Sequence, residues 1–329
     1  MSNGCETSPL LSPPPFSAFQ KVGVLGALVR HVEQTRDISA FFRSPIRRSR
    51  LSSKITPMTP ASVPQLARLR AAIDSADHIL VGAGSGLSTA AGFTYSGERF
   101  HRHFADLYTG GFYPFPTLEE RWAYWSRYIY INRYDQPAGQ PYLDLKSLLH
   151  GRDAFVLTTN TDHRFYVAGF DTDRLFCTQG DYGQCQCPVP CHQTVYQNES
   201  FVRQMLAEQK DMRIPTKLIP CCPVCGEPLR MNLRNDQAFV EDEYWHGMQS
   251  SYLDFVKRTL SGKLLLLEIG VGGNSPGVIK YPFWQLTYGQ RNLTYACIND
   301  GEAVAPREIL DRSILVNGDA GAVLRELLQ

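Results

Sequence analysis

A glycine-rich turn between a short apolar strand and a helix is the feature that most limits how this chain can fold. Residues 78–81 predict the strand, and Gly82, Gly84, Gly86 and Gly92 lie in the turn and the helix start that follow. Glycines let a backbone approach a pyrophosphate closely, and free N–H groups at a helix start attract its negative charge. The turn therefore predicts a phosphate or nucleotide site, with a tight turn that holds no ligand as the alternative.

The turn departs from the strict dinucleotide fingerprint. Leu87 stands where the third glycine of that pattern belongs. The acidic residue expected about twenty positions further on, at the end of a second strand, is also missing. Asp106 lies instead in an aromatic stretch that we expect to be helical. The turn alone thus indicates nucleotide binding and does not indicate hydride transfer.

Further short apolar runs have the character of buried parallel strands. They are residues 154–157, 264–269, 294–298 and 313–316, and stretches with helical character separate most of them. Such alternation is typical of βαβ units. We therefore predict an α/β fold, a Rossmann-like parallel sheet with helices on both faces, plus a small zinc-binding and helical domain. Ligands of such sheets bind beyond the carboxyl ends of the strands, where this chain places Gly82, Asn160, Gly270, Asn299 and Gly318.

Two short cysteine pairs predict a metal site. One pair has x₃ spacing and the other x₂ spacing, and a Cys₄ set of this kind holds a structural zinc ion. Clustered cysteines also favour a reducing compartment over a disulfide framework. Cys185 and Cys221 are alternatives to the first member of each pair. The preferred ligands are Cys187, Cys191, Cys222 and Cys225.

Composition excludes several classes of function. Lys and Arg number 33 against 32 Asp and Glu, so the charge gives no indication of nucleic acid binding. The apolar runs 22–29 and 264–267 are far shorter than the ~20 residues that span a bilayer. We expect a soluble, cytoplasmic protein that binds neither nucleic acid nor membrane.

The domain boundaries follow from shifts in composition. Residues 1–60 hold eight Lys or Arg against three acids, and we expect a disordered extension or a misassigned start, with Met58 as initiator. An organellar targeting arm is the alternative. Residues 61–329 should form the catalytic domain, with an inserted zinc-binding domain at 177–245. The aromatic segment 108–142 is interpreted as small-domain core, with a substrate-facing wall as the alternative.

Taken together, these motifs resemble the sirtuin family over about residues 63–328. Residues 84–93 are similar to its cofactor loop, 159–162 to QNxD, 270–272 to GTS, 298–299 to IN and 318–320 to GDA. The cysteine pairs lie between the second and third of these motifs, as in the family. The resemblance implies NAD as co-substrate, bound by Gly84, Ser85, Gly86, Ser88, Gly92, Thr159, Asn160, Asp162, Gln179, Gly270, Val271, Gly272 and Asn299.

Two departures from the family pattern indicate a subfamily. Residues 94–100 replace the usual PDFR, and Gln179 stands where sirtuins have their catalytic histidine. Both resemble the macrodomain-linked microbial class, whose members resemble protein mono-ADP-ribosyltransferases. The resemblance implies that Asn160 and Gln179 are catalytic and that Asp162 accepts from the nicotinamide carboxamide. It also implies a protein acceptor, such as a lipoylated carrier protein, and a macrodomain hydrolase as partner.

The chemistry of glutamine supports this assignment. Deacylation needs a base that deprotonates a ribose hydroxyl, and a glutamine amide has no titratable proton for that step. His163 is interpreted as a helix-start histidine, although it could supply the missing base. The rival functions are NAD-dependent lysine deacylation and a non-catalytic sensor of NAD or ADP-ribose.

Overall fold

The structure, a computed structural model, describes residues 63–94, 114–273 and 276–329. The expected extension at 1–60, Met58 and most of the segment that replaces PDFR lie outside these residues. A six-stranded sheet has the order β3-β2-β1-β7-β8-β9, and a three-stranded sheet has the order β5-β4-β6. The strands are β1 (His78–Ala83), β2 (Ala154–Thr158), β3 (Leu175–Cys177), β4 (Gly180–Gln186), β5 (Tyr196–Gln197), β6 (Arg230–Leu233), β7 (Leu264–Ile269), β8 (Thr294–Asn299) and β9 (Ser313–Asn317).

The larger sheet is the predicted Rossmann-like sheet. All five strands expected from the sequence are present, and every pairing in this sheet is parallel. The chain builds β1, β2 and β3 toward one edge and then β7, β8 and β9 toward the other. The order therefore reverses between β1 and β7, and such a switch point opens a crevice for ligands at the carboxyl ends of the strands.

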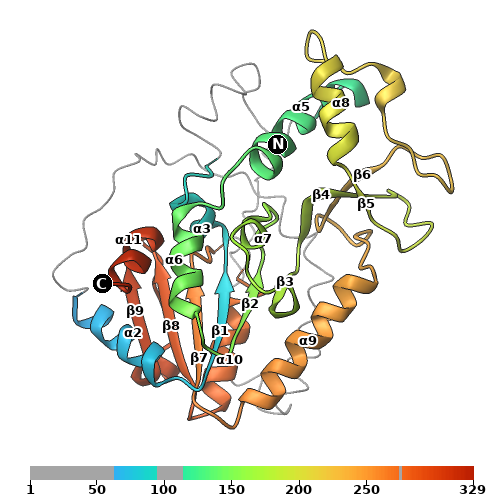
Figure 1. Cartoon of the computed structure of the whole chain (residues 1–329). Helices are drawn as coiled ribbons and strands as arrows, with labels where there is room; N and C mark the ends of the chain where they lie inside the picture. Colours follow the sequence, from blue (N-terminus) through green and yellow to red (C-terminus); the bar gives the residue numbers. More distant parts are fainter. Residues whose placement is uncertain (1–62, 95–113, 274–275) are drawn as a thin grey trace, which may run out of the picture.

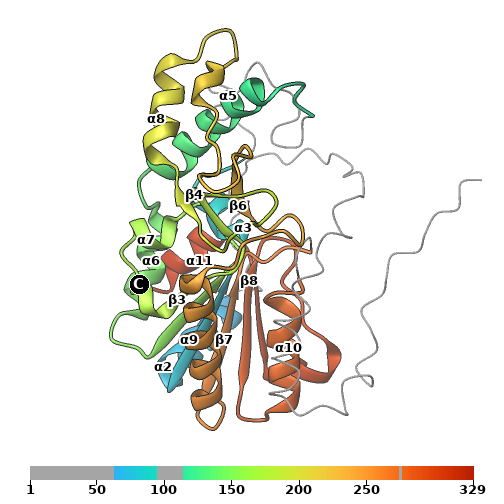
Figure 2. The same cartoon turned by 90° about the vertical axis from the view of Figure 1, so that its right-hand side faces the viewer.

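Helices cover both faces of this sheet, as Figure 1 and Figure 2 show. Alternate residues of β1 enter opposite cores: Ile79, Val81 and Ala83 join one cluster and Leu80 the other. This alternation follows from the two-residue repeat of a strand. The first face carries α2 (Val63–Ser75), α3 (Ser85–Ala90), α6 (Gln140–Leu149) and α11 (Ala320–Glu326), and the second carries α9 (Glu243–Thr259) and α10 (Lys280–Gly289).

A second core lies beyond the carboxyl ends of the main strands, at the top of Figure 1. The three-stranded sheet packs there against α5 (Leu118–Ile129) and α8 (Glu199–Glu208). Trp122 of the aromatic segment is buried in this core, as the packing interpretation expected. The short elements are α7 (Arg164–Val167), the π-helix η5 (Tyr130–Tyr134) and the 3₁₀ turns η6 (Thr172–Arg174), η7 (Thr216–Leu218) and η8 (Arg307–Arg312). None of the helices in the described ranges combines the length and apolar character needed to cross a bilayer.

Candidate functional site

The glycine turn packs directly against the loop after β7. The amide of Gly84 donates to the Ile269 carbonyl at 2.9 Å, and the amide of Gly86 donates to the Gly270 carbonyl at 2.9 Å. A Cβ added to Gly86 would lie 2.6 Å from the Gly270 Cα, so the close approach of two backbones requires glycine there. Gly270 itself has φ +61, in the left-handed region. The two loops thus form one continuous floor at the switch point.

The loop after β8 joins this floor. The Asn299 side-chain amide donates to the Val271 carbonyl at 2.9 Å. Gly272 follows Val271 in the same loop, and Gly92 ends the glycine turn with φ +86 in open space. The residues expected to contact the cofactor from three separate strands therefore lie together at one edge of the sheet.

A cavity of about 100 Å³ lies beside this floor, and we call it the Asp162 cavity. It gathers residues from the glycine turn, from the loop after β2 and from the segment between α5 and α6. Five of the expected site residues line it together with neighbours that the sequence did not indicate. The lining residues are Ser85, Ser88, Thr89, Phe93, Thr94, Tyr128, Asn132, Thr159, Asn160, Thr161, Asp162 and Tyr182, with Ser85, Ser88, Thr159, Asn160 and Asp162 among the expected contacts.

Asp162 anchors a buried hydrogen-bond network in this cavity. Ser88 Oγ donates to Asp162 Oδ2 at 2.6 Å, and Tyr142 OH lies 2.8 Å from Ser88 Oγ. The Asn160 amide donates to Tyr142 OH at 3.2 Å and to the Gly84 carbonyl at 3.0 Å. Burial raises the pKa of Asp162, although hydrogen bonds from Ser88 and the Arg164 backbone act in the opposite direction. The network ties the glycine turn to the loop after β2.

Arg164 fixes the wall of the Asp162 cavity from behind. Its guanidinium is fully buried and donates to the carbonyls of Asn132, Arg133, Gln136 and Pro137 at 2.8–2.9 Å. Its Nε donates to the Asp162 carbonyl at 3.0 Å. A buried charge is tolerated when its donors are satisfied in this way. Arg164 therefore holds the end of the π-helix against the loop that carries Asp162.

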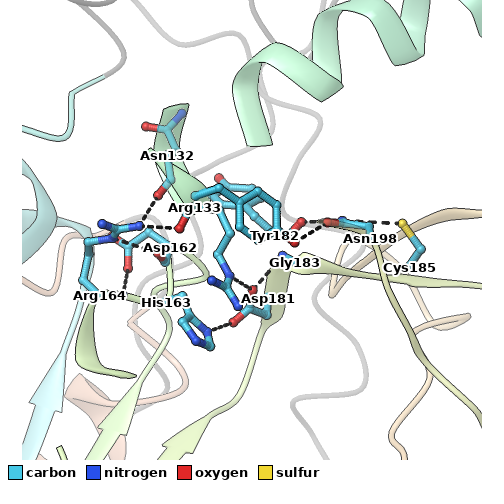
Figure 3. Close-up of polar contacts among 11 residues, drawn as sticks. Asn132, Arg133, Asp162, His163, Arg164, Asp181, Tyr182, Gly183, Cys185 and Asn198 are labelled. Carbon is cyan, nitrogen blue, oxygen red and sulfur yellow. Dashed lines mark hydrogen bonds and ion pairs between the residues drawn. The ribbon is translucent and has the colours of Figure 1, made fainter. Parts of the chain in front are cut away.

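A second ionic cluster lies next to this loop (Figure 3). His163 Nδ1 is hydrogen-bonded to Asp181 Oδ2, and Arg133 Nε donates to Asp181 Oδ1 at 2.8 Å. Burial opposes ionisation of Asp181, but His163 and Arg133 outweigh it and hold the pKa of this carboxyl below its usual value. His163 precedes α7, in agreement with its interpretation as a helix-start residue.

The cluster faces a larger cavity of about 430 Å³, which we call the His163 cavity. Its lining contains both polar and apolar side chains. The lining residues are Arg133, His163, Tyr166, Phe176, Cys177, Gly180, Asp181, Gln184, Val195, Gln197, Asn232, Val240, Asp242, Tyr244, Trp245 and Met248. The cavity therefore lies between the edge strand β3, the smaller sheet and the start of α9.

Gln179 occupies the turn between β3 and β4. It is half-buried, and its carbonyl accepts from the Arg234 amide at 3.1 Å. Its side chain is not among the described residues that line either cavity. Sequence reasoning singled out Gln179 by motif, and it overlooked Tyr142, Arg164 and Asp181. Tyr142 alone gave a signal, since it lies in the aromatic segment. Arg164 and Asp181 gave none, because contacts between residues distant along the chain leave no local sequence pattern.

The four preferred cysteines come together in the smaller part of the fold. The ligand atoms of Cys187, Cys191, Cys222 and Cys225 all lie within 4.8 Å of one another. The Cys187–Cys225 and Cys191–Cys222 sulfurs are 3.5 and 3.6 Å apart. Zn–S bonds of ~2.3 Å in a tetrahedron place sulfurs about 3.8 Å apart, so the donor set and its dimensions fit Zn²⁺.

The alternative cysteines point elsewhere. Cys185 is fully buried in the core of the smaller part, where Asn198 donates to its sulfur at 3.7 Å. Cys221 is exposed, and its thiol faces the Ile219 carbonyl. Cys185 lies within β4, whereas Cys187 follows the end of the strand, where the strand no longer sets the direction of the side chain.

Known proteins with similar sequences share one described activity. No family model matches the chain. A protein ADP-ribosyltransferase of Staphylococcus aureus is 37% identical over 271 residues, which make up 79% of this chain and 86% of that relative. A probable bifunctional ADP-ribose hydrolase/ADP-ribosyltransferase of Fusarium oxysporum is 32% identical over 84% of this chain, which spans 50% of that relative.

Solved structures show the fold. A sirtuin structure that addresses substrate affinity is 16% identical and covers 79% of this chain and 97% of its own, with a TM-score of 0.53. A Sir2 mutant with a p53 peptide and NAD is 16% identical and covers 80% and 97%, with a TM-score of 0.50. The expected resemblance is confirmed: the chain has the sirtuin fold and belongs to the family of protein ADP-ribosyltransferases.

Proposed function

We propose that this protein transfers ADP-ribose from NAD to a protein acceptor and releases nicotinamide. The observation that carries the proposal is the Asp162 cavity, where a buried carboxylate, a serine hydroxyl and an asparagine amide meet beside the glycine turn. Relatives named for this activity support the same conclusion. The established sirtuin base is absent from its usual position, where this chain has Gln179.

Each residue has a proposed role in holding NAD as substrate. Gly84, Ser85, Gly86 and Gly92 with Ser88 would bind the dinucleotide from one side, and Gly270, Val271, Gly272 and Asn299 from the other. Asp162 would accept from the nicotinamide carboxamide, because its carboxylate faces the cavity. Asn160 and Thr159 would contact the ribose, with Gln179 as a positioning group. Breaking the bond between nicotinamide and C1′ develops positive charge on the ribose, which fixed polar groups stabilise.

Zinc would have a structural role. The four cysteines would hold the ion at the edge of the smaller core, and a closed Cys₄ site stabilises the fold without taking part in chemistry. We include residues 177–245 in the zinc-binding part, and residues 1–60 as an extension that turnover does not need. Free thiolates need reducing conditions, which suits a cytoplasmic location.

The acceptor and partner follow from the family resemblance. We infer a protein acceptor, and among proteins a lipoylated carrier is the one that the resemblance implies. The Fusarium relative combines hydrolase and transferase in its name, which supports a macrodomain hydrolase acting on the product. The acceptor assignment can be tested by comparing the lipoylated and unmodified forms of one carrier protein.

The transfer of labelled ADP-ribose from NAD to protein tests the activity. Asn160→Ala should lower the rate by about 10²–10³, the usual cost of losing one preorganised polar contact. Gln179→Ala should lower it less, because it misplaces groups without removing a base. His150→Ala, at an exposed position just after the end of α6, is the matched control. Efficient cleavage of an acetylated peptide by the wild type, with no labelled protein, would instead establish a deacylase.

A further inference from the structure

Three chain segments contribute residues to both cavities. In each segment, neighbouring residues face opposite sides. Asn132, Asp162 and Tyr182 line the Asp162 cavity, whereas Arg133, His163 and Asp181 line the His163 cavity. Figure 3 shows these pairs side by side. The two cavities therefore adjoin at the loop after β2, and the His163 cavity lies next to the site proposed for nicotinamide.

The His163 ring is held in one orientation. Asp181 accepts from Nδ1, and Tyr166 stacks on the ring with centroids 4.1 Å apart and planes at 18°. Asp181 is held in turn by Arg133 and by the Gly183 amide at 2.6 Å. When a carboxylate binds the Nδ1 proton, the neutral ring keeps its lone pair on Nε2. None of the described residues hydrogen-bonds Nε2, which leaves this atom available on the cavity side.

The backbone of His163 is in a conformation that a histidine adopts at a cost. Its φ of 64° and ψ of 10° lie in the left-handed region, where glycine is favoured. Strained positions of this kind persist when the surrounding structure holds them, and they gather at functional sites. Glycine would adopt this backbone conformation without strain. The contacts of the imidazole ring and the cavity that it lines therefore explain why histidine stands at this position.

We propose that the His163 cavity receives the nucleophile of the acceptor and that His163 is the general base that takes its proton. The proposal rests on the proposed ADP-ribosyl transfer. The acceptor group X–H forms a bond from X to C1′ of the ribose, and the bond from C1′ to the nicotinamide nitrogen breaks with its electron pair on that nitrogen. The X–H proton passes to His163 Nε2. The resulting imidazolium is stabilised by the Asp181 carboxylate, and the proton later leaves to solvent.

This assignment names the class of acceptor. A carboxylate acceptor would carry no proton to remove, whereas a neutral O–H, N–H or S–H group would need a base. The lining of the cavity includes the apolar side chains of Phe176, Val240, Trp245 and Met248. The acceptor group should therefore be protic and attached to an apolar stem.

Other titratable and charged groups face His163 from every neighbouring element. Arg133 comes from the π-helix, Asp181 from β4 and Tyr166 from α7. Asp162 and Arg164 flank His163 in the chain. Cys177 ends β3, and Asp242 and Tyr244 stand at the start of α9. Burial raises the pKa of Tyr166 and Cys177 well above the neutral range, so both stay protonated and cannot replace His163 as base. Asp181 is ionised at neutral pH because its pKa is lowered.

The variant His163→Gly separates a catalytic from a structural role. Glycine suits the left-handed backbone, which offsets the lost contacts of His163 with Asp181 and Tyr166, so the melting temperature should stay close to that of the wild type. Transfer to protein should fall about 10²-fold or more, with kcat affected rather than the KM for NAD. The wild-type rate should rise with pH as the base loses its proton, and the variant should lack this limb. Added imidazole should restore transfer in the variant, increasingly at higher pH.

The outcomes are distinguishable. His150→Ala, which also removes a histidine, should keep the pH profile of the wild type, and Asp181→Asn should lower kcat without abolishing it. A wild type without any transfer to protein refutes the proposed function itself. If the wild type transfers ADP-ribose and the His163→Gly variant has the same rate and pH profile, His163 is not the general base. This result would favour a carboxylate acceptor. Loss of activity with a lowered melting temperature and no rescue by imidazole assigns His163 a structural role and overturns the proposal.

Discussion

The contact between the glycine turn and the loop after β7 makes Gly86→Ala an informative substitution. The added Cβ would lie 2.6 Å from the Gly270 Cα and 2.9 Å from its carbonyl oxygen. Ordinary contact begins at 3.4 Å, so the two backbones must separate by several tenths of an ångström. Overpacking of this kind costs about 1–3 kcal/mol. The amide of Gly86 also donates to the Gly270 carbonyl at 2.9 Å, and weakening that bond adds about 1 kcal/mol.

We therefore expect the free energy of unfolding to fall by about 2–4 kcal/mol, measured by chemical denaturation. The same displacement moves residues proposed to bind NAD, so the Kd for NAD should rise at least tenfold, about 1.4 kcal/mol. Gly277→Ala is the control, because a Cβ at Gly277 meets nothing within 4 Å. Equal denaturation midpoints and equal NAD affinity for Gly86→Ala and the wild type would show that the loops are not packed as described.

Three further predictions concern zinc, pH and the start of the chain. Cys222→Ser should lose zinc and unfold the smaller part, whereas Cys221→Ser should keep one zinc per chain by elemental analysis; the reverse result would change the ligand set. A hydrogen bond from Arg258, aided by His78 and nearby charges, lowers the pKa of Asp153 to about 2, so folding favours the ionised form. Asp153→Asn should therefore be less stable than the wild type above about pH 4, and denaturation curves should converge as the pH falls toward 2. A chain that begins at Met58 should have the melting temperature of the full chain and turn over NAD at the same rate. A markedly lower melting temperature would contradict this.

The elements that the sequence predicted are those with a local signal. The strands at 154–158 and 264–269 are almost wholly apolar, interrupted only by Thr158 and Glu268, because both of their faces are buried. The cysteine pairs could also be predicted from the sequence, since the ligand spacing within each pair is a property of one short segment. The glycine turn was also predicted from its sequence pattern, although the pattern did not indicate that Gly86 packs against the Gly270 backbone. The strand Leu175–Cys177 was missed because three residues are too few to display a period.

The chemistry of the site is decided by contacts between distant segments. Ser88, Tyr142 and Asp162 meet because α3, α6 and the loop after β2 all begin at the same edge of a parallel sheet. His163 is joined to Asp181 because the start of β4 lies beside the loop after β2, where the Tyr182 amide donates to the Thr161 carbonyl at 2.9 Å. Sequence determined which residues follow each strand, since local pattern reports burial and turns. Tertiary structure alone decided which side chains face one another, because a hydrogen bond between distant segments leaves no periodic trace in either of them.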